Sequence, residues 1–130
     1  MTSTQNQKAR LEPKERAQHL LNEKAPAQKL QGTITITVWL SATDQKIALN
    51  WTNTGPIGRW DYVALFSANP QQVGALGYLT NQWQYTSEQS SPYITGTSSG
   101  KGNAYWIAYC AWDYGQKKYV VVESSGPFEP

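Results

Sequence analysis

The chain has 130 residues, a length typical of one domain, and a formal net charge of only +2 at pH 7. A chain this close to neutral lacks the strong positive potential that draws proteins to nucleic acids, so we expect no nucleic-acid partner. The single cysteine, Cys110, excludes an intrachain disulfide. The N-terminus has no apolar stretch of signal-peptide length, and no later stretch approaches the length of a transmembrane segment. We therefore expect a cytoplasmic protein, or one released without a signal peptide.

Residues 1–31 differ from the rest of the chain in charge and in pattern. They carry six Lys or Arg against three Glu, a local net charge of +3, whereas the remainder is close to neutral. Pro13 suits the first turn of a helix, a thin apolar stripe follows at helical spacing, and Pro26 ends the pattern. The sequence therefore predicts a basic N-terminal extension over residues 1–31, partly helical or disordered, and a β-domain over residues 32–130.

From residue 33 onward the sequence predicts strands. Residues 33–41 alternate apolar and polar side chains, which is typical of a strand with one face against a core. Further short strands, separated by turn-forming residues, are predicted over residues 46–52, 61–67, 75–80, 82–87, 92–97, 104–113 and 118–124. Seven or eight short strands without helical periodicity after residue 32 indicate an all-β fold, an antiparallel β-sandwich.

The strand predicted over residues 104–113 is apolar on both faces, although a strand with one face in water should alternate. Tyr105, Ile107 and Tyr109 are predicted to point into the core. If the strand over residues 61–67 is its neighbour, the opposite face carries the large rings of Tyr62, Phe66, Trp106 and Trp112. Three such rings bury on the order of 500 Å², which is comparable with the largest apolar patch that a soluble monomer exposes. We expect a cover for this face: a second subunit, a ligand, or the N-terminal segment through Leu11, Leu20, Leu21 and Leu30.

The sequence contains no recognisable catalytic or metal-binding arrangement. A nucleophile needs a base within reach, but the only histidine, His19, lies in the N-terminal segment, and Cys110 stands among aromatic residues in mid-strand. Acidic residues show no paired spacing, and a Cys/His ligand set is absent. Residues 96–102 resemble a phosphate-binding loop but lack its glycine spacing and the helix that should follow. We therefore expect a protein that is not an enzyme and that binds no cofactor or metal.

A second group of aromatic residues lies at predicted strand ends and turns, where each ring stands near Asp, Asn or Gln. The group consists of Trp60, Asp61, Asn81, Trp83, Trp112, Asp113 and Tyr114. Sugar recognition uses this combination, because ring faces pack on C–H groups while carboxylates and amides bind paired hydroxyls. We therefore predict a non-enzymatic, lectin-like carbohydrate-binding module with these residues as its site. The alternative interpretation is that Trp60 and Trp83 close the ends of the core and that the aspartates cap turns.

Two segments resemble the SKICH family of domains. Residues 59–66, with the sequence RWDYVALF, are similar to the family strand DW(I/V)G(I/L)(F/Y). The segment YWIAYC at residues 105–110, followed by Asp113, Gly115 and SSGPF, resembles the last hairpin of that family, YxFxY…D…G…(A/S)S…PF. The resemblance covers about residues 33–130. It implies an immunoglobulin-like β-sandwich that serves as a recognition module for protein partners or for membrane localisation.

The functional alternatives differ in their partner. A lectin-like module binds a glycan, and assembly into a homo-oligomer would raise its avidity. A SKICH-type module would dock a protein partner on a sheet edge or on the interaction face formed by Tyr62, Phe66, Trp106 and Trp112. A membrane-active, toxin-like protein would need a strongly amphipathic N-terminal helix, and the thin stripe after Pro13 does not supply one.

Overall fold

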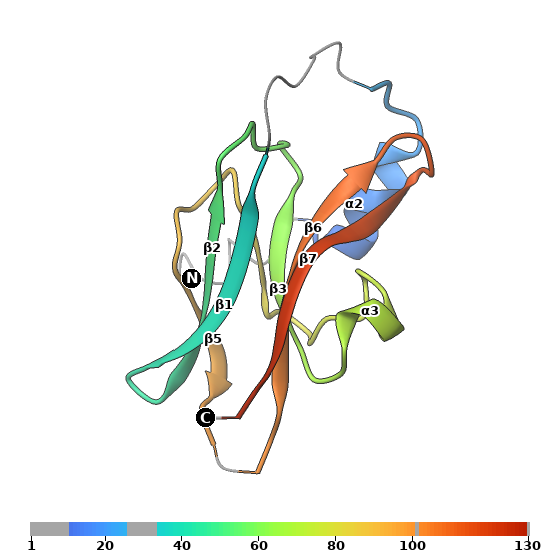
Figure 1. Cartoon of the computed structure of the whole chain (residues 1–130). Coiled ribbons are helices and arrows are strands. Elements are labelled where there is room, and N and C mark those ends of the chain that lie inside the picture. The colour runs from blue at the N-terminus through green and yellow to red at the C-terminus, as the bar shows by residue number, and fades with distance from the viewer. Residues whose placement is uncertain (1–10, 26–33, 101, 130) are drawn as a thin grey trace, which may run out of the picture.

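Two antiparallel β-sheets pack face to face in the structure, a computed structural model that describes residues 11–25, 34–100 and 102–129 (Figure 1). The first sheet has the strand order β1-β2-β5, with β1 at Ile36–Thr43, β2 at Lys46–Asn53 and β5 at Tyr93–Ser98. The second has the order β4-β3-β6-β7, with β3 at Tyr62–Phe66, β4 at Trp83–Tyr85, β6 at Tyr105–Asp113 and β7 at Lys118–Phe128. Two short helices lie within the described residues, α2 at Pro13–Leu20 and α3 at Pro70–Val73. The all-β antiparallel sandwich predicted from the sequence is confirmed.

The core between the sheets is formed by alternate side chains of the central strands. Val63 and Leu65 of β3 are fully buried, as are Ile107 and Tyr109 of β6. The first sheet contributes Val38, Ile47, Leu49 and Trp51 to the same cluster. Burial of one large apolar side chain stabilises a fold by about 1.5–3 kcal/mol, so this cluster is a main source of stability. The predicted inward orientation of Tyr105, Ile107 and Tyr109 is confirmed.

The outer face of the second sheet carries a separate cluster of large rings. β3 and β6 are neighbours, and their register places Tyr62 opposite Cys110 and Phe66 opposite Trp106. Tyr62 and Phe66 are fully buried, whereas Trp106 and Trp112 are only partly buried. The expected cover is therefore present over Tyr62 and Phe66. Of the four rings of the alternative interaction face, only Trp106 and Trp112 keep exposed parts that a partner could contact.

The strand predicted over residues 75–80 is also wrong, and this segment supplies one part of the cover. The residues form turns after α3, because Gly74 with φ 89° ends that helix in a conformation that favours glycine. Ala75 and Tyr78 are both buried although they are three positions apart, so the segment does not alternate as a strand does. The Tyr62 hydroxyl donates to the carbonyl of Ala75 at 2.5 Å, which ties residues 74–79, called the loop cover here, to β3.

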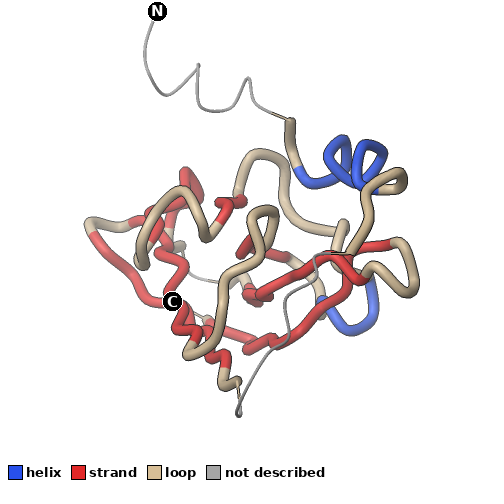
Figure 2. Tube along the Cα trace, turned by 90° about the horizontal axis from the view of Figure 1, so that it is seen from above, coloured by secondary structure: helices blue, strands red, loops and turns tan. Residues whose placement is uncertain are grey.

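The helix predicted in the N-terminal segment is present and supplies the other part of the cover. It begins at Pro13, whose missing N–H is not needed in a first turn, and Leu20 is 1% exposed against the outer cluster. Both helices lie on the same side of the two sheets (Figure 2). The predicted cover is thus confirmed for Leu20, whereas Leu21 is 41% exposed and Leu30 lies outside the described residues. Because residues 1–10 and 26–31 also lie outside them, the limits of the N-terminal extension stay a prediction.

Tyrosine hydroxyl groups attach α2 to the sheet. The hydroxyl of Tyr78 donates to Oε1 of Glu12 at 2.6 Å and accepts from the N–H of Lys14 at 3.3 Å. The hydroxyl of Tyr85 donates to the carbonyl of Leu11 at 2.8 Å. These bonds attach the start of α2 to the sheet, and the buried Leu20 holds its end.

Candidate functional site

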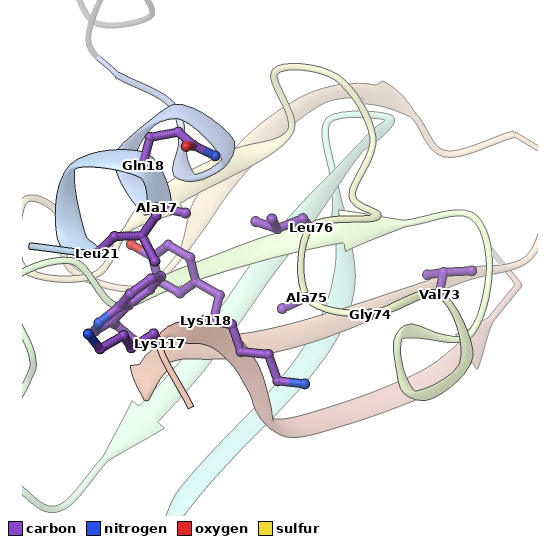
Figure 3. A pocket seen from close by; sticks show the side chains of 11 residues that line it. Ala17, Gln18, Leu21, Val73, Gly74, Ala75, Leu76, Lys117 and Lys118 are labelled. Carbon is purple, nitrogen blue, oxygen red and sulfur yellow. The ribbon is translucent and has the colours of Figure 1, made fainter. Parts of the chain in front are cut away.

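Two adjacent hollows lie on the covered side of the second sheet, and Trp112 of β6 lines both. The first, called the polar cavity here, has a volume of about 350 Å³. It is lined by the charged residues Glu23, Lys24, Arg59 and Asp61, by the rings of Trp60, Trp112 and Tyr114, and by Gly58. The second, called the apolar groove here, has a volume of about 340 Å³ and lies between α2, the loop cover and the β6–β7 hairpin (Figure 3).

Segments that are far apart in the sequence meet at the polar cavity. Glu23 and Lys24 follow the end of α2, and residues 58–61 form the loop that leads into β3. Trp112 and Tyr114 come from the end of β6 and the turn after it. Because β3 and β6 are antiparallel neighbours, the start of β3 lies beside the end of β6, and this pairing brings the two aromatic segments together.

Trp60 is fixed by its backbone and by contacts to its ring. Its carbonyl accepts a hydrogen bond from the Tyr119 hydroxyl at 2.7 Å, and its ring meets Tyr85 edge to face at 5.3 Å between centroids. The guanidinium carbons of Arg16 and Arg59 lie 3.7 and 4.6 Å from the ring centroid, which is close enough for cation–π attraction. Arg16 belongs to α2 and its Nε is buried without a hydrogen bond, whereas Arg59 is exposed. Of these two cations, Arg59 is the one that a ligand can displace.

Asp61 is only 9% exposed, and its two carboxylate oxygens differ in their partners. Oδ2 accepts from the N–H of Gly58 at 3.0 Å and from the Tyr109 hydroxyl at 2.8 Å, whereas Oδ1 has no hydrogen bond with any described residue. Burial raises the pKa of the Asp61 carboxyl above its ordinary value, and the two hydrogen bonds oppose that rise without cancelling it. A Cβ at position 58 would lie 2.5 Å from Oδ1, so glycine at this position leaves the oxygen accessible.

The turn after β6 gives Asp113 a structural role. The Asp113 carboxylate accepts from the N–H groups of Gly115 at 2.8 Å and Gln116 at 3.0 Å. Hydrogen bonds from Gln116, above all, lower the pKa of the Asp113 carboxyl. This carboxylate therefore caps its own turn, which was the alternative interpretation for it, and it does not line the cavity.

The structure brings together only part of the predicted site. Four of the predicted residues line the polar cavity: Trp60, Asp61, Trp112 and Tyr114. Trp83 is 1% exposed and packs edge to face on Tyr85 at 5.0 Å, so the prediction of a surface ring is wrong for it. Asn81 is exposed in a turn with φ 65° and does not line the cavity. Trp83 is buried because it belongs to the outer cluster, which Leu20 of α2 and Ala75 and Tyr78 of the loop cover also join. All three residues of β4 are buried.

Three charged lining residues, Glu23, Lys24 and Arg59, were not predicted. Arg59 directly precedes Trp60, and its carbonyl accepts from the Ser87 hydroxyl at 2.8 Å, which fixes the backbone at the cavity. Because Arg59 stands next to the predicted site residue Trp60, the sequence could have indicated that it belongs to the site. Glu23 and Lys24 carried no such signal, because only the docking of α2 brings its end to the cavity.

Comparisons of this chain with protein-family models, with curated proteins and with solved structures find no match. Its function is therefore inferred from the geometry of its own residues. Neither described helix has the length and apolar character needed to cross a membrane. Within residues 11–25, 34–100 and 102–129, no group of three or more His, Cys, Asp or Glu side chains is placed to hold a metal ion.

Proposed function

We propose that this chain is a non-enzymatic, lectin-like carbohydrate-binding module and that a glycan binds in the polar cavity. The proposal is supported above all by the convergence of two tryptophans, a tyrosine and a nearly buried carboxylate on one cavity of about 350 Å³. Small-molecule sites commonly have volumes of about 300–1,000 Å³ and combine apolar walls with a few fixed polar groups. The cavity is at the lower end of this size range, and its lining combines three aromatic rings with four charged side chains, of which the Asp61 carboxylate is fixed by hydrogen bonds.

The polar groups of the cavity suit the hydroxyl groups of a sugar. Oδ1 of Asp61 is free of hydrogen bonds with the described residues, and Glu23 offers a second carboxylate, so both can accept from hydroxyls. Arg59 and Lys24 can only donate, so they pair with hydroxyl oxygens. Hydrogen bonds with a charged partner are about twice as strong as neutral ones. A sugar, which donates and accepts at every hydroxyl, satisfies both kinds of group at once.

The aromatic groups of the cavity suit the C–H face of a sugar ring. Trp60 has its backbone and ring held in place, so it loses little freedom when a ligand packs on it. Displacement of the exposed Arg59 side chain opens one contact to this ring, and the same guanidinium then becomes available to hydroxyl groups. Trp112 at the end of β6 and Tyr114 in the turn after it add further ring surface to the same cavity.

We also infer that the sandwich is immunoglobulin-like and of the SKICH type. The inference is supported by the position of the two segments that carry the resemblance, because residues 59–66 run into β3 and residues 105–110 lie in the adjacent strand β6. The alternative function is then a protein-interaction or membrane-localisation module. It would use a sheet edge or the exposed parts of Trp106 and Trp112, since the other rings of the predicted face are covered.

A glycan array tests the proposed function. Labelled native protein is compared with heat-denatured protein, and we expect selective binding to a set of related glycans. Arg59→Ala and Tyr114→Ala should weaken this binding at least tenfold, because each removes a side chain that lines the cavity. Trp39→Ala is the matched control, since Trp39 is 44% exposed on β1 of the other sheet.

Two outcomes contradict the proposal. An array without binding, obtained with protein whose circular dichroism shows the native fold, rejects carbohydrate binding and favours a protein partner. Binding that survives Arg59→Ala and Tyr114→Ala but is lost in Trp39→Ala moves the site to the first sheet.

A further inference from the structure

The apolar groove (Figure 3) lies next to the polar cavity, since Trp112 lines both, and its lining is more apolar. Ala17 and Leu21 line it from α2 and its end, Ala75 and Leu76 from the loop cover, and Trp112 from β6. Among the described residues, none of its lining side chains is acidic. A hollow with these walls favours hydrocarbon over hydroxyl groups.

Exposed apolar side chains gather at this groove. Leu21 is 41% exposed and Val73 is 48% exposed, and both line the same hollow. Single exposed apolar residues need no explanation, but these two line one groove together with Ala75, Leu76 and Trp112, so they add to its apolar lining. Lys117 and Lys118 of the hairpin also line the groove, beside Gln18, Gly74 and Tyr119, and the lysine methylene stems can cover hydrocarbon while the ammonium groups stay in water.

The size of the groove favours a small-molecule chain over a protein partner. Stable protein interfaces bury about 800 Å² on each partner, and they need a broad surface. The apolar groove has a volume of about 340 Å³, which is at the lower end of small-molecule sites. A flexible alkyl chain fits a hollow of this kind.

Trp112 and the end of α2 connect the two hollows. Trp112 lines both, and its Nε1 is buried without a hydrogen bond, so the indole acts as an apolar wall. Leu21 lines the groove, while Glu23 and Lys24, only a few residues later, line the cavity. A ligand that lies across Trp112 therefore meets hydroxyl-binding groups on one side and hydrocarbon on the other.

We propose that the ligand is a glycoside with an alkyl aglycone, whose sugar occupies the polar cavity and whose chain lies in the apolar groove. This inference rests on the proposed function and specifies its ligand class. The sugar supplies orientation through hydrogen bonds, and the chain supplies affinity by leaving water.

Matched methyl and octyl β-D-glycosides test the inference by isothermal titration calorimetry with the full chain. Glucosides, galactosides and mannosides are used in parallel, below the concentrations at which the octyl compounds form micelles. We expect the octyl form of the bound sugar to bind at least tenfold more tightly than its methyl form. Octyl tetraethylene glycol ether, which has the chain without the sugar, should bind at least tenfold more weakly than the octyl glycoside.

A double variant, Leu21→Ser with Val73→Ser, locates the chain. Both residues are exposed, so the fold should persist, and circular dichroism checks that it does. We expect the octyl glycoside to lose most of its advantage, while binding of the methyl glycoside stays unchanged. Val122→Ser is the matched control, because Val122 is 45% exposed on β7 and does not line the groove.

The outcomes separate this inference from the proposed function. Equal affinities for methyl and octyl glycosides overturn the alkyl aglycone but leave carbohydrate binding intact. Equal affinities for the octyl glycoside and the sugar-free ether overturn both, because the sugar then contributes nothing. An octyl preference that survives the double variant overturns the assignment of the chain to the groove.

Discussion

In the sheet β4-β3-β6-β7, both faces of β3 and of the middle of β6 are buried, but they are buried by different means. The inner face packs on a second sheet through aliphatic side chains such as Leu65 and Ile107. The outer face carries rings and is covered by α2 and the loop cover, which tyrosine hydroxyls attach. Segments held by few contacts can open without unfolding the rest of a domain. The same strands therefore form the core on one face, and the proposed binding site lies at the border of the cover on the other.

Leu65→Ala should cause the largest loss of stability, because it removes a side chain from the inner face. Leu65 is fully buried on β3 between the sheets, so its truncation leaves a cavity that the surrounding strands cannot fill. We expect a loss of about 2–5 kcal/mol in the free energy of unfolding, measured by urea denaturation. A loss below about 1 kcal/mol would show that the sandwich core relaxes around the cavity and would remove the contrast between the faces.

Leu20→Ala should weaken the outer cover with a smaller effect. Leu20 is 1% exposed, but it anchors a helix of eight residues that can detach locally. We expect a loss of about 2 kcal/mol or less, and hydrogen exchange should show reduced protection in α2 while the amides of β3 keep theirs. If protection falls equally in both elements, α2 is part of the global folding unit and the cover is not light.

The fold was predictable because hydrophobic alternation reports directly on which face of a strand is buried. Residues 104–113, apolar on both faces, also predicted that something covers the outer face, and Leu20 does so. The loop cover was not predicted, because its apolar residues look like a strand until Gly74 and the preceding helix set its path. Local pattern cannot distinguish a short strand from a segment that packs on a sheet.

The candidate site was predictable where residues are brought together by the pairing of neighbouring strands. It was not predictable where the packing of a helix or loop determines which side chains are buried. Trp60 and Asp61 precede β3 and Trp112 ends β6, so the antiparallel pairing of these strands brings them together. Trp83 has the same sequence context, yet it is buried because α2 and the loop cover lie over β4. Glu23 reaches the cavity through the docking of a helix, which no local pattern encodes.

Tyr78→Phe should weaken the attachment of α2 to the outer face, with a smaller effect than Leu20→Ala. The variant removes the hydroxyl that donates to Glu12 at 2.6 Å and accepts from the N–H of Lys14 at 3.3 Å. We expect a loss of about 1 kcal/mol in the free energy of unfolding and faster hydrogen exchange in the first turn of α2. Tyr119→Phe is the control, because its hydroxyl bonds the Trp60 carbonyl instead, so it should leave α2 protection unchanged.

Asp61→Asn should have the smallest effect on stability and should still impair binding, because Asp61 links the two faces. Both hydrogen bonds of the carboxylate fall on Oδ2, so the single carbonyl oxygen of Asn can accept from Gly58 and Tyr109 alike. We expect a change within about 1 kcal/mol in the free energy of unfolding. The amide nitrogen then replaces Oδ1, which accepts no hydrogen bond from the described residues, and glycan affinity should fall about tenfold, the cost of one charge-assisted hydrogen bond.

The pH dependence of this variant has a defined sign. Burial raises the pKa of Asp61 in the folded state, so its contribution to stability is fully present below the ordinary carboxyl pKa and is lost as the pH rises through the raised value. Asn has no such loss, so the stability of Asp61→Asn relative to the natural chain should increase as the pH rises from about 3 to about 7. Urea denaturation across this range measures it, with the exposed Asp44→Asn as the control of equal charge change. A difference that shrinks with rising pH would mean that the hydrogen bonds to Oδ2 outweigh burial, and Asp61 would then be a stabilising charge of the core.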